Sequence, residues 1–342
     1  MRIAVVASPV TPLRPAQLGG AQAFVCDLAL GLVRRGHEVT VYCAETSELE
    51  GVRLVTVPAP DDAAAALVMP GGHEPPPAPG VARALAAMFD SIAASSVDVI
   101  SQHAFDVPAF ELARDMPVLH TLHLPPIVAS VARVVGAVSP SRLATVSASC
   151  LAEWHAAGVD VGQVLPNGVP AAPVPELPVD RWALVAGRLS PEKGVEHAIA
   201  AARSIGLPVR VAGAHYDPAY ELDLSGTEVV GSVPRDQLRS LMSRSAVTVC
   251  AVRWEEPFGM VAAEAQMAGC PMAAYRRGAM AEVVQDGLSG RLAEPDDVAA
   301  LGRAIGQCLE LDRAAVRASA VRRLGLDAAL DRYEAALLRA SR

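Results

Sequence analysis

The chain has 342 residues, a formal net charge of −8 and a hydrophobic content of 52%. A chain of this length usually exceeds what one hydrophobic core serves, so we expect two domains. The acidic balance argues against a nucleic acid as partner, and no apolar run approaches the roughly 18 residues that would predict a membrane span. The apolar run in the opening MRIAVVASPV is too short for a signal peptide, and the six cysteines form no CxxC pattern. We therefore expect reduced thiols and a cytoplasmic protein.

Short apolar runs alternate with helical stretches along the first half of the chain. The runs fall at residues 2–7, 38–43, 52–57, 97–101, 144–147 and 162–165. Alternation of this kind predicts a parallel, doubly wound α/β sheet. The loop before the first helix contains Gly19 and Gly20 but no GxGxxG, which argues against a dinucleotide-dependent oxidoreductase.

A strong turn signal marks the end of the first half. It is the run Pro166, Asn167 and Gly168, and a proline-rich stretch over 169–180 follows it. We expect this stretch to be a linker. Further strand-like runs at 182–186, 208–213, 228–230 and 246–251 predict a second parallel sheet, and consecutive helices broken near Gly325 complete the chain.

Two cations stand out in the turn GRLSPEKG, directly after the strand expected at 182–186. Arg188 and Lys193 follow the carboxyl end of that strand, where open α/β sheets bind ligands. A guanidinium can grip two phosphate oxygens in a planar fork, whereas an ammonium acts as a mobile point charge. The pair indicates an anion site.

The richest stretch runs from residue 253 to residue 290. Glu255 and Glu256 precede Pro257 and Gly259, and the helix expected at 260–268 is apolar almost all round. Such a helix is buried, yet it contains one acid, Glu264, and a buried carboxylate needs a polar partner. The uncapped amides of Gly259, Met260 and Val261 at its start would favour a bound anion. The stretch thus offers a phosphate site flanked by two acids.

These motifs together resemble a known family. The spacing Glu256-x7-Glu264 within EPFG, the following GCP and DGLSG, the G-R-x4-K-G turn and the PNG turn are similar to the donor-site signature of retaining glycosyltransferases of family 4. The resemblance implies the GT-B fold, with two Rossmann-like doubly wound parallel-sheet domains that face each other across a cleft. It implies an acceptor-side domain over 1–168, onto which a helix over 327–342 packs back. The donor domain would then occupy 181–326.

The resemblance also implies roles for individual residues. Arg188, Lys193 and the amides of 259–261 would hold the pyrophosphate of a nucleotide diphosphate sugar, with UDP as the expected nucleotide. Glu264 would bind the ribose. The remaining candidates would contact the donor in other ways: Glu256 and the backbone of Phe258 and Gly259 orient the sugar, His123 in the TLHL stretch touches it, and Gly19 with Gly20 approaches the phosphates. Arg277 and Gly278 are followed by Ala279 where the family usually has a second glycine, so close backbone approach there is open.

Several expectations about substrates accompany this reading. The sequence has no D-x-D triplet, so we expect no metal and no other cofactor. The loop over 58–80 is expected to border the acceptor site. The acceptor would be a soluble small molecule or small glycan, because the helix expected at 127–138 lacks a basic cluster for lipid. We expect a monomer or homodimer. The chain is also similar to actinomycete antibiotic-pathway enzymes of the avilamycin type.

Two alternatives remain open at the level of the sequence. One is a sugar-nucleotide epimerase or phosphorylase of the same fold. The other is a non-catalytic subunit that binds a nucleotide sugar, which the complete set of Arg188, Lys193, Glu256 and Glu264 disfavours.

Overall fold

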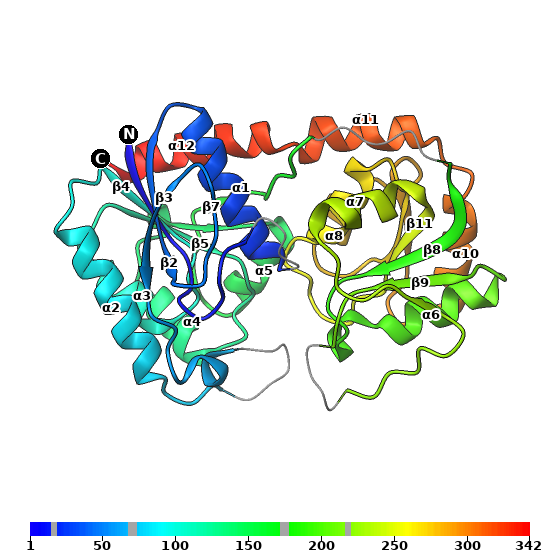
Figure 1. Ribbon diagram of the computed structural model, residues 1–342, viewed down its shortest axis with the longest axis horizontal. Helices are drawn as coiled ribbons and strands as arrows, with labels where there is room; N and C mark the ends of the chain where they lie inside the picture. The colour runs from blue at the N-terminus through cyan, green and yellow to red at the C-terminus, as the bar shows by residue number, and fades with distance from the viewer. Residues whose placement is uncertain (15–18, 68–73, 172–177, 216–219) are drawn as a thin grey trace. The chain divides into compact units, whose positions relative to one another are not determined.

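The computed structural model describes residues 1–14, 19–67, 74–171, 178–215 and 220–342 (Figure 1). The chain divides into two compact units. Unit 1 comprises residues 1–168 together with 326–342, and unit 2 comprises residues 169–325. Each unit is built around its own parallel sheet.

The sheet of unit 1 has seven strands in the order β3-β2-β1-β4-β5-β6-β7, and all neighbours are parallel. The strands are β1 (Arg2–Val6), β2 (Glu38–Ala44), β3 (Arg53–Val57), β4 (Val99–Gln102), β5 (Val118–Leu122), β6 (Leu143–Thr145) and β7 (Gln163–Val164). The central strands are buried along their whole length, as expected for a sheet covered on both faces.

Six α-helices accompany this sheet in the described residues. They are α1 (Gly20–Arg34), α2 (Pro79–Ala93), α3 (Val107–Leu112), α4 (Ala129–Val135), α5 (Ala148–Ala156) and α12 (Leu326–Ala340). Helices α2, α3, α4 and α5 bury their apolar side chains in two clusters with the sheet. Helix α12 contacts α1, β4 and β5. A Cβ on Gly31 of α1 would lie 2.7 Å from Leu330 Cδ1, so the two helices approach closely because this residue is glycine.

The sheet of unit 2 has six parallel strands in the order β10-β9-β8-β11-β12-β13. The strands are β8 (Asp180–Ala186), β9 (Val209–Ala212), β10 (Glu228–Val229), β11 (Ser245–Cys250), β12 (Met272–Tyr275) and β13 (Gly290–Ala293). Its α-helices are α6 (Val195–Ser204), α7 (Arg235–Arg244), α8 (Met260–Met267), α9 (Met280–Val283), α10 (Val298–Cys308) and α11 (Arg313–Leu324).

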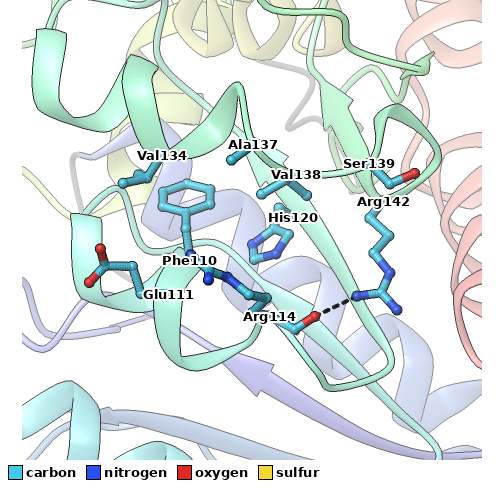
Figure 2. A pocket seen from close by; sticks show the side chains of 9 residues that line it. All are labelled: Phe110, Glu111, Arg114, His120, Val134, Ala137, Val138, Ser139 and Arg142. Carbon is cyan, nitrogen blue, oxygen red and sulfur yellow. Dashed lines mark hydrogen bonds between the residues drawn. The ribbon is translucent and has the colours of Figure 1, made fainter.

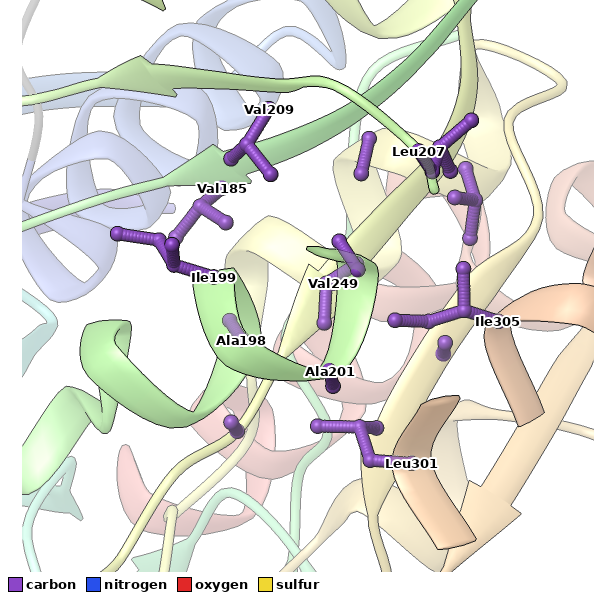
Figure 3. Packing of buried hydrophobic residues seen from close by; sticks show 14 of the residues in the cluster. Val185, Ala198, Ile199, Ala201, Leu207, Val209, Val249, Leu301 and Ile305 are labelled. Atoms are coloured by element: carbon purple, nitrogen blue, oxygen red, sulfur yellow. The ribbon is translucent and has the colours of Figure 1, made fainter. Parts of the chain in front are cut away.

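One face of the second sheet carries the main core of unit 2. Figure 3 shows Ile199 and Ala201 of α6 packed with Leu301 and Ile305 of α10 and with sheet residues such as Val249. Small residues on α6 let α10 pack against it. Elsewhere in the unit, α8 contacts both α7 and α11. The loops that carry the predicted site residues of unit 2 follow the carboxyl ends of β8 and β11.

The two parallel α/β sheets expected from the sequence are confirmed. Strands β12 and β13 were not predicted, and η1 (Ala63–Ala66) is a 3₁₀ turn inside a stretch expected to be loop. At the ends of the linker expected over 169–180, Val169 N donates to Leu324 O at 2.8 Å and Asp180 is the first residue of β8. Residues 172–177 of this linker lie outside the described residues, as do 68–73 of the expected acceptor loop.

None of the six cysteines, all of which lie in described residues, forms a disulfide; five are buried and Cys250 is partly buried. No helix in the described ranges is both long and apolar enough to cross a bilayer.

Candidate active site

The loop after β8 presents the first two predicted cations. Gly187 has a φ of 124°, which favours glycine, and it turns the chain out of the strand. Arg188 Nη2 lies 3.5 Å from Glu192 Oε1, and the same oxygen accepts a hydrogen bond from Ser190 Oγ at 2.6 Å. Glu192 is only 8% exposed. This buried acid, which the sequence did not single out, therefore holds the loop together and places Arg188.

Lys193 and Glu256 meet directly. Lys193 Nζ lies 2.7 Å from Glu256 Oε2, and Trp254 Nε1 donates to the same oxygen at 2.8 Å. The ammonium also lies 5.3 Å from the centre of the Trp254 ring. Two residues predicted for different tasks are thus one cluster, and Trp254 is a third member that the sequence analysis missed.

Backbone contacts join the loop after β8 to the segment after β11. Arg253 N donates to Glu192 O at 2.8 Å. Gly194 has a φ of 58°, and a Cβ there would lie 2.0 Å from Ala251 O. A Cβ on Gly187 would lie 4.0 Å from Val261 Cγ2, in the first turn of α8. The cations after β8 and the start of α8 therefore belong to one site within unit 2.

Gly278 lies where a close approach of two backbone segments requires a glycine, next to Ala279. Its φ is 58°, and a Cβ there would lie 2.3 Å from Glu256 N. Gly278 N donates to Glu255 Oε2 and Ala279 N donates to Glu256 O, both at 2.8 Å. Close approach to the Glu255–Glu256 backbone needs glycine only at 278, so Ala279 is accommodated.

The amino end of α8 is open. Gly259 is its N-cap, with a φ of 91°, and no side chain caps it. This positive φ favours glycine, whereas the atom nearest to an added Cβ would be Cε at the flexible end of Met280, at 2.0 Å. Within the described residues, no protein acceptor is hydrogen bonded to the amides of Gly259, Met260 and Val261. An anion could therefore take these three donors.

Glu264 has the polar partner that its buried helix requires. Arg235 Nε, at the first residue of α7, donates to Glu264 Oε1 at 2.6 Å, and the two side chains are 12% and 13% exposed. The sequence predicted that a partner must exist but gave no signal for Arg235, which is 29 residues away. Glu264 therefore carries a charge that is balanced by the protein itself.

His123 lies in unit 1, directly after β5, and it is bound to a second histidine. His103 Nδ1 lies 2.9 Å from His123 Nε2, and His103 Nε2 lies 2.9 Å from Ser101 Oγ. Burial lowers the pKa of His123 to about 4, and burial together with the neighbouring histidines lowers the pKa of His103 well below its usual value. Both imidazoles are therefore neutral at physiological pH. Nδ1 of His123 has no hydrogen-bond partner within the described chain.

The glycines of the first loop also belong to unit 1. Gly19 is the N-cap of α1 without a side-chain hydrogen bond, and Gly20 is the first helical residue. Residues 15–18 of this loop lie outside the described residues. The candidates are thus divided: Gly19, Gly20 and His123 are in unit 1, whereas the cations, the acids and the start of α8, including the buried Phe258, are in unit 2.

Comparison with known proteins assigns the family. The model of the family described as Glycosyltransferase Family 4 matches residues 18–172, and that of Glycosyl transferases group 1 matches residues 176–323. A relative from Xylanimonas cellulosilytica, named D-inositol 3-phosphate glycosyltransferase, is 30% identical, and the match covers 96% of this chain and 93% of the relative. The chain belongs to the group 1 glycosyltransferases.

Other relatives extend this assignment. A glycogen synthase of Mycobacterium tuberculosis is 30% identical to this glycosyltransferase, over 68% of the chain and 65% of the relative's own length, which is just under two thirds. Among solved structures, AviGT4, a glycosyltransferase involved in avilamycin A biosynthesis, has a TM-score of 0.75 at 22% identity, covering 99% of this chain and 98% of its own. Anabaena HepE in complex with UDP and glucose has a TM-score of 0.74 at 17% identity, covering 99% and 100%. These structures establish the GT-B fold.

Proposed function

We propose that this glycosyltransferase moves a sugar from a nucleoside diphosphate sugar, with UDP as the nucleotide, to a hydroxyl group of an acceptor with retention at the anomeric carbon. The observation that carries the proposal is the cluster of Lys193, Glu256 and Trp254 beside the open amino end of α8. It combines anion donors with an oriented carboxylate, which is what a phosphate-linked sugar requires.

The pyrophosphate takes the cations and the helix terminus. Arg188 offers a planar fork and Lys193 a point charge, while the amides of Gly259, Met260 and Val261 add neutral donors supported by the helix dipole. Negative charge grows on the leaving phosphate as the sugar–oxygen bond breaks. Donors already in position therefore stabilise the transition state more than the bound substrate.

Glu256 orients the sugar. Its Oε2 is held by Lys193 and Trp254, so the plane of the carboxylate is fixed and Oε1 can accept from a sugar hydroxyl. When a phosphate binds, Lys193 shares its three donors between the phosphate and Glu256. The ion pair thus couples recognition of the phosphate to recognition of the sugar.

Glu264 binds the ribose. Arg235 occupies one lone pair of Oε1, and a carboxylate has about four acceptor sites, so two ribose hydroxyls can still donate to it. Hydrogen bonds to a charged group are worth roughly 1.5–3 kcal/mol. Arg235 acts on the nucleotide through Glu264 and is a positioning residue.

Retention follows from attack on the face that the nucleotide leaves. The bond from the anomeric carbon to the phosphate oxygen breaks, the bond to the acceptor oxygen forms, and the acceptor proton passes to the departing phosphate oxygen. His123 contributes a hydrogen bond to the sugar. This bond is made by a neutral ring, because burial lowers the pKa of His123 to about 4. No separate general base is needed.

The nucleotide and the reaction can be tested in sequence. Thermal-shift titration with UDP, dTDP and GDP identifies the nucleotide, because binding raises apparent stability by mass action. Sugar transfer is then followed with UDP-glucose and candidate acceptors, including D-inositol 3-phosphate because relatives carry that substrate in their names. Free UDP that forms only with acceptor supports the proposal, and the anomeric proton coupling of the product reports retention. Conversion of the donor without acceptor would indicate an epimerase, a requirement for inorganic phosphate would indicate a phosphorylase, and binding without turnover would indicate a binding subunit.

We propose further that no divalent metal takes part, since the sequence lacks the D-x-D chelate and offers cations for the same task. Turnover should survive excess EDTA. Loss of turnover that Mn²⁺ or Mg²⁺ restores would contradict this account of the phosphate site.

A further inference from the structure

Unit 1 contains a pocket of about 220 Å³ between α3, α4 and β5 (Figure 2). Nine residues line it: Phe110, Glu111, Arg114, His120, Val134, Ala137, Val138, Ser139 and Arg142. None of them has a role in the proposed transfer.

The pocket lies away from the predicted donor contact of unit 1. Arg114 precedes the amino end of β5, and Arg142 ends the 3₁₀ turn η2 (Pro140–Arg142) directly before β6. His103 and His123 follow the carboxyl ends of β4 and β5 instead. Substrates of open α/β sheets bind at the carboxyl ends, so a ligand at the arginines would occupy a different site.

His120 is the most informative residue of the lining. It is 1% exposed, and its ring stacks on Phe110 with a centroid distance of 4.9 Å. Burial and the charge of Arg142 lower the pKa of His120 to about 3, so the ring is neutral. Its Nδ1 has no hydrogen-bond partner in the described part of the chain. A buried polar atom without a partner is costly, and a ligand in the pocket could supply one.

The remaining lining residues indicate the charge of that ligand. Arg114 and Arg142 outnumber the single acid Glu111, in a chain whose net charge is −8. Arg142 Nη1 donates to Arg114 O at 2.8 Å, which orders the guanidinium at the pocket (Figure 2). Guanidinium groups bind carboxylate and phosphate oxygens in pairs. The charge of the lining therefore favours an anion.

The walls indicate the rest of the ligand. Phe110, Val134 and Val138 provide the apolar part of the lining. The volume is below the about 300–1,000 Å³ of pockets for drug-sized ligands, so the ligand is small. We propose that this pocket binds a small organic oxyanion, a carboxylate or phosphate monoester attached to a compact apolar group. The anion lies at Arg142 and Arg114, the apolar group packs on Phe110, and a polar atom of the ligand bonds to His120.

Binding of matched probes tests the proposal directly. Benzoate and phenyl phosphate carry the two oxyanions on one ring, and benzamidine carries a cation on the same ring. We expect saturable binding of one or both anions, detected by calorimetry and by a shift of the His120 imidazole resonances in NMR spectra. Benzamidine should bind at least tenfold more weakly. The stronger of the two anions identifies the ligand class.

Variants locate the binding. Arg142→Gln and Arg114→Gln should each weaken binding of the preferred anion about tenfold or more, because each removes a charge-assisted contact. Arg133→Gln on α4, an exposed arginine outside the lining, is the matched control and should change nothing. If Arg142→Gln fails to fold, Arg114→Gln carries the test, since the Arg114 side chain is exposed.

Three outcomes would overturn the proposal: no saturable binding of either anion, equal binding of benzamidine, or unchanged affinity in the arginine variants. The assay needs no donor or acceptor, so it stands whether or not sugar transfer is confirmed.

Discussion

The carboxyl ends of the two sheets differ in how they carry polar groups. In unit 2 three cations are each paired with an acid, as Arg188–Glu192, Lys193–Glu256 and Arg235–Glu264. In unit 1 the corresponding end carries the neutral chain Ser101–His103–His123. The paired charges of unit 2 can exchange partners when an anion arrives, whereas the Ser101–His103–His123 chain can offer only hydrogen bonds at physiological pH.

The pairing in unit 2 explains how so many charges pack around one loop. Each cation that awaits a phosphate already has a carboxylate partner, so none is left buried and uncompensated. The Lys193 and Glu256 side chains are 22% and 13% exposed, which is enough burial to strengthen the pair beyond a surface ion pair. A phosphate that binds here joins an organised network.

The largest expected effect comes from removing the two phosphate cations. Arg188→Ala and Lys193→Ala should each lower kcat about 10²–10³-fold, because a preplaced cation acts mainly on the developing charge of the leaving phosphate. The double variant should lose less than the product of the single effects if both serve one pyrophosphate. Steady-state kinetics with the donor identified by the binding screen gives both values.

Two further variants sharpen this test. Arg188→Lys should not restore kcat, because an ammonium cannot reproduce the bidentate fork. Arg181→Ala, at an exposed arginine on β8, is the control and should leave kcat unchanged. Normal kcat in the alanine variants, with or without a raised KM, would remove these cations from the transition state.

The three buried histidines of unit 1 should affect the pH dependence of its stability. Burial lowers the pKa of His103, of His120 to about 3 and of His123 to about 4, whereas the unfolded chain takes up these protons near pH 6.5. Below that pH the unfolded state binds more protons than the folded state, so the free energy of unfolding decreases as the pH is lowered. At pH 5.5 each histidine costs roughly 1.3 kcal/mol, about 4 kcal/mol together.

Asp106 offsets part of this loss. Burial raises its pKa to about 6, so the folded state gains a proton that the unfolded state lacks, and stability recovers by roughly 1 kcal/mol. The net loss from pH 7.5 to 5.5 should be about 3 kcal/mol for unit 1. Urea unfolding followed by fluorine NMR of 5-fluorotryptophan at Trp154 reports on unit 1 separately from Trp182 and Trp254.

A matched pair of variants shows which histidines cause the pH dependence of the unfolding free energy of unit 1. His120→Leu should remove about a third of the histidine contribution, and His155→Gln, at an exposed histidine, is the matched control. A stability of unit 1 that is flat between pH 7.5 and 5.5 would mean that these histidines are accessible to protons in the folded protein.

The sequence predicted the two parallel sheets well because strand-like runs and helical stretches alternate clearly. Strands β12 (MAAY) and β13 (GRLA) were missed because each has only four residues and contains no β-branched residue. Individual site residues were predictable from local motifs. Their partners were not, because Lys193 and Glu256 are 63 residues apart and pairing at that separation depends on the tertiary fold.

Some partners did leave a signal. Trp254 lies two residues before Glu256 in a chain with only 4% aromatic residues, and this position could have identified it as a candidate. Arg235 and Glu192 are ordinary charged residues in a helix start and a turn, and nothing local distinguishes them from surface charges. His103 lies two residues after the strand predicted over 97–101. Only the parallel pairing of β4 with β5 brings it close to His123.

The pair Arg235–Glu264 tests whether an acid can serve both the fold and the nucleotide. Glu264→Gln keeps the size of the side chain but removes its charge, so UDP affinity should fall by roughly 1.5–3 kcal/mol, or about 10–100-fold. The fold should also lose about 1–3 kcal/mol, because the buried ion pair between Arg235 and Glu264 is lost. Calorimetry with UDP and urea unfolding measure the two losses.

The double variant Arg235→Gln/Glu264→Gln separates them. It should recover stability relative to Glu264→Gln, since both charges of the ion pair are removed together, yet UDP affinity should stay low. If Glu264→Gln unfolds more easily but binds UDP normally, Glu264 is a structural acid only.

The smallest expected effect concerns His103, which we propose sets the proton position on His123. His103 Nδ1 is 2.9 Å from His123 Nε2, so one of these nitrogens carries the hydrogen and the other accepts it. If Ser101 donates to His103, then His103 donates to His123, and His123 presents a donor at Nδ1; the reverse chain presents an acceptor there. His103→Phe breaks the chain and should lower kcat/KM about tenfold or less, in keeping with a neutral hydrogen bond of about 1 kcal/mol.

His103→Asn is the control for this last prediction, because its side-chain amide can occupy the place of the Nδ1 atom and still bond to His123. It should retain more activity than His103→Phe. Nitrogen NMR shifts of His123 report its tautomer independently of activity, and they should change in His103→Phe but not in His103→Asn. If both variants leave the His123 tautomer and kcat/KM unchanged, His103 contributes only packing, and it does not set the proton position on His123.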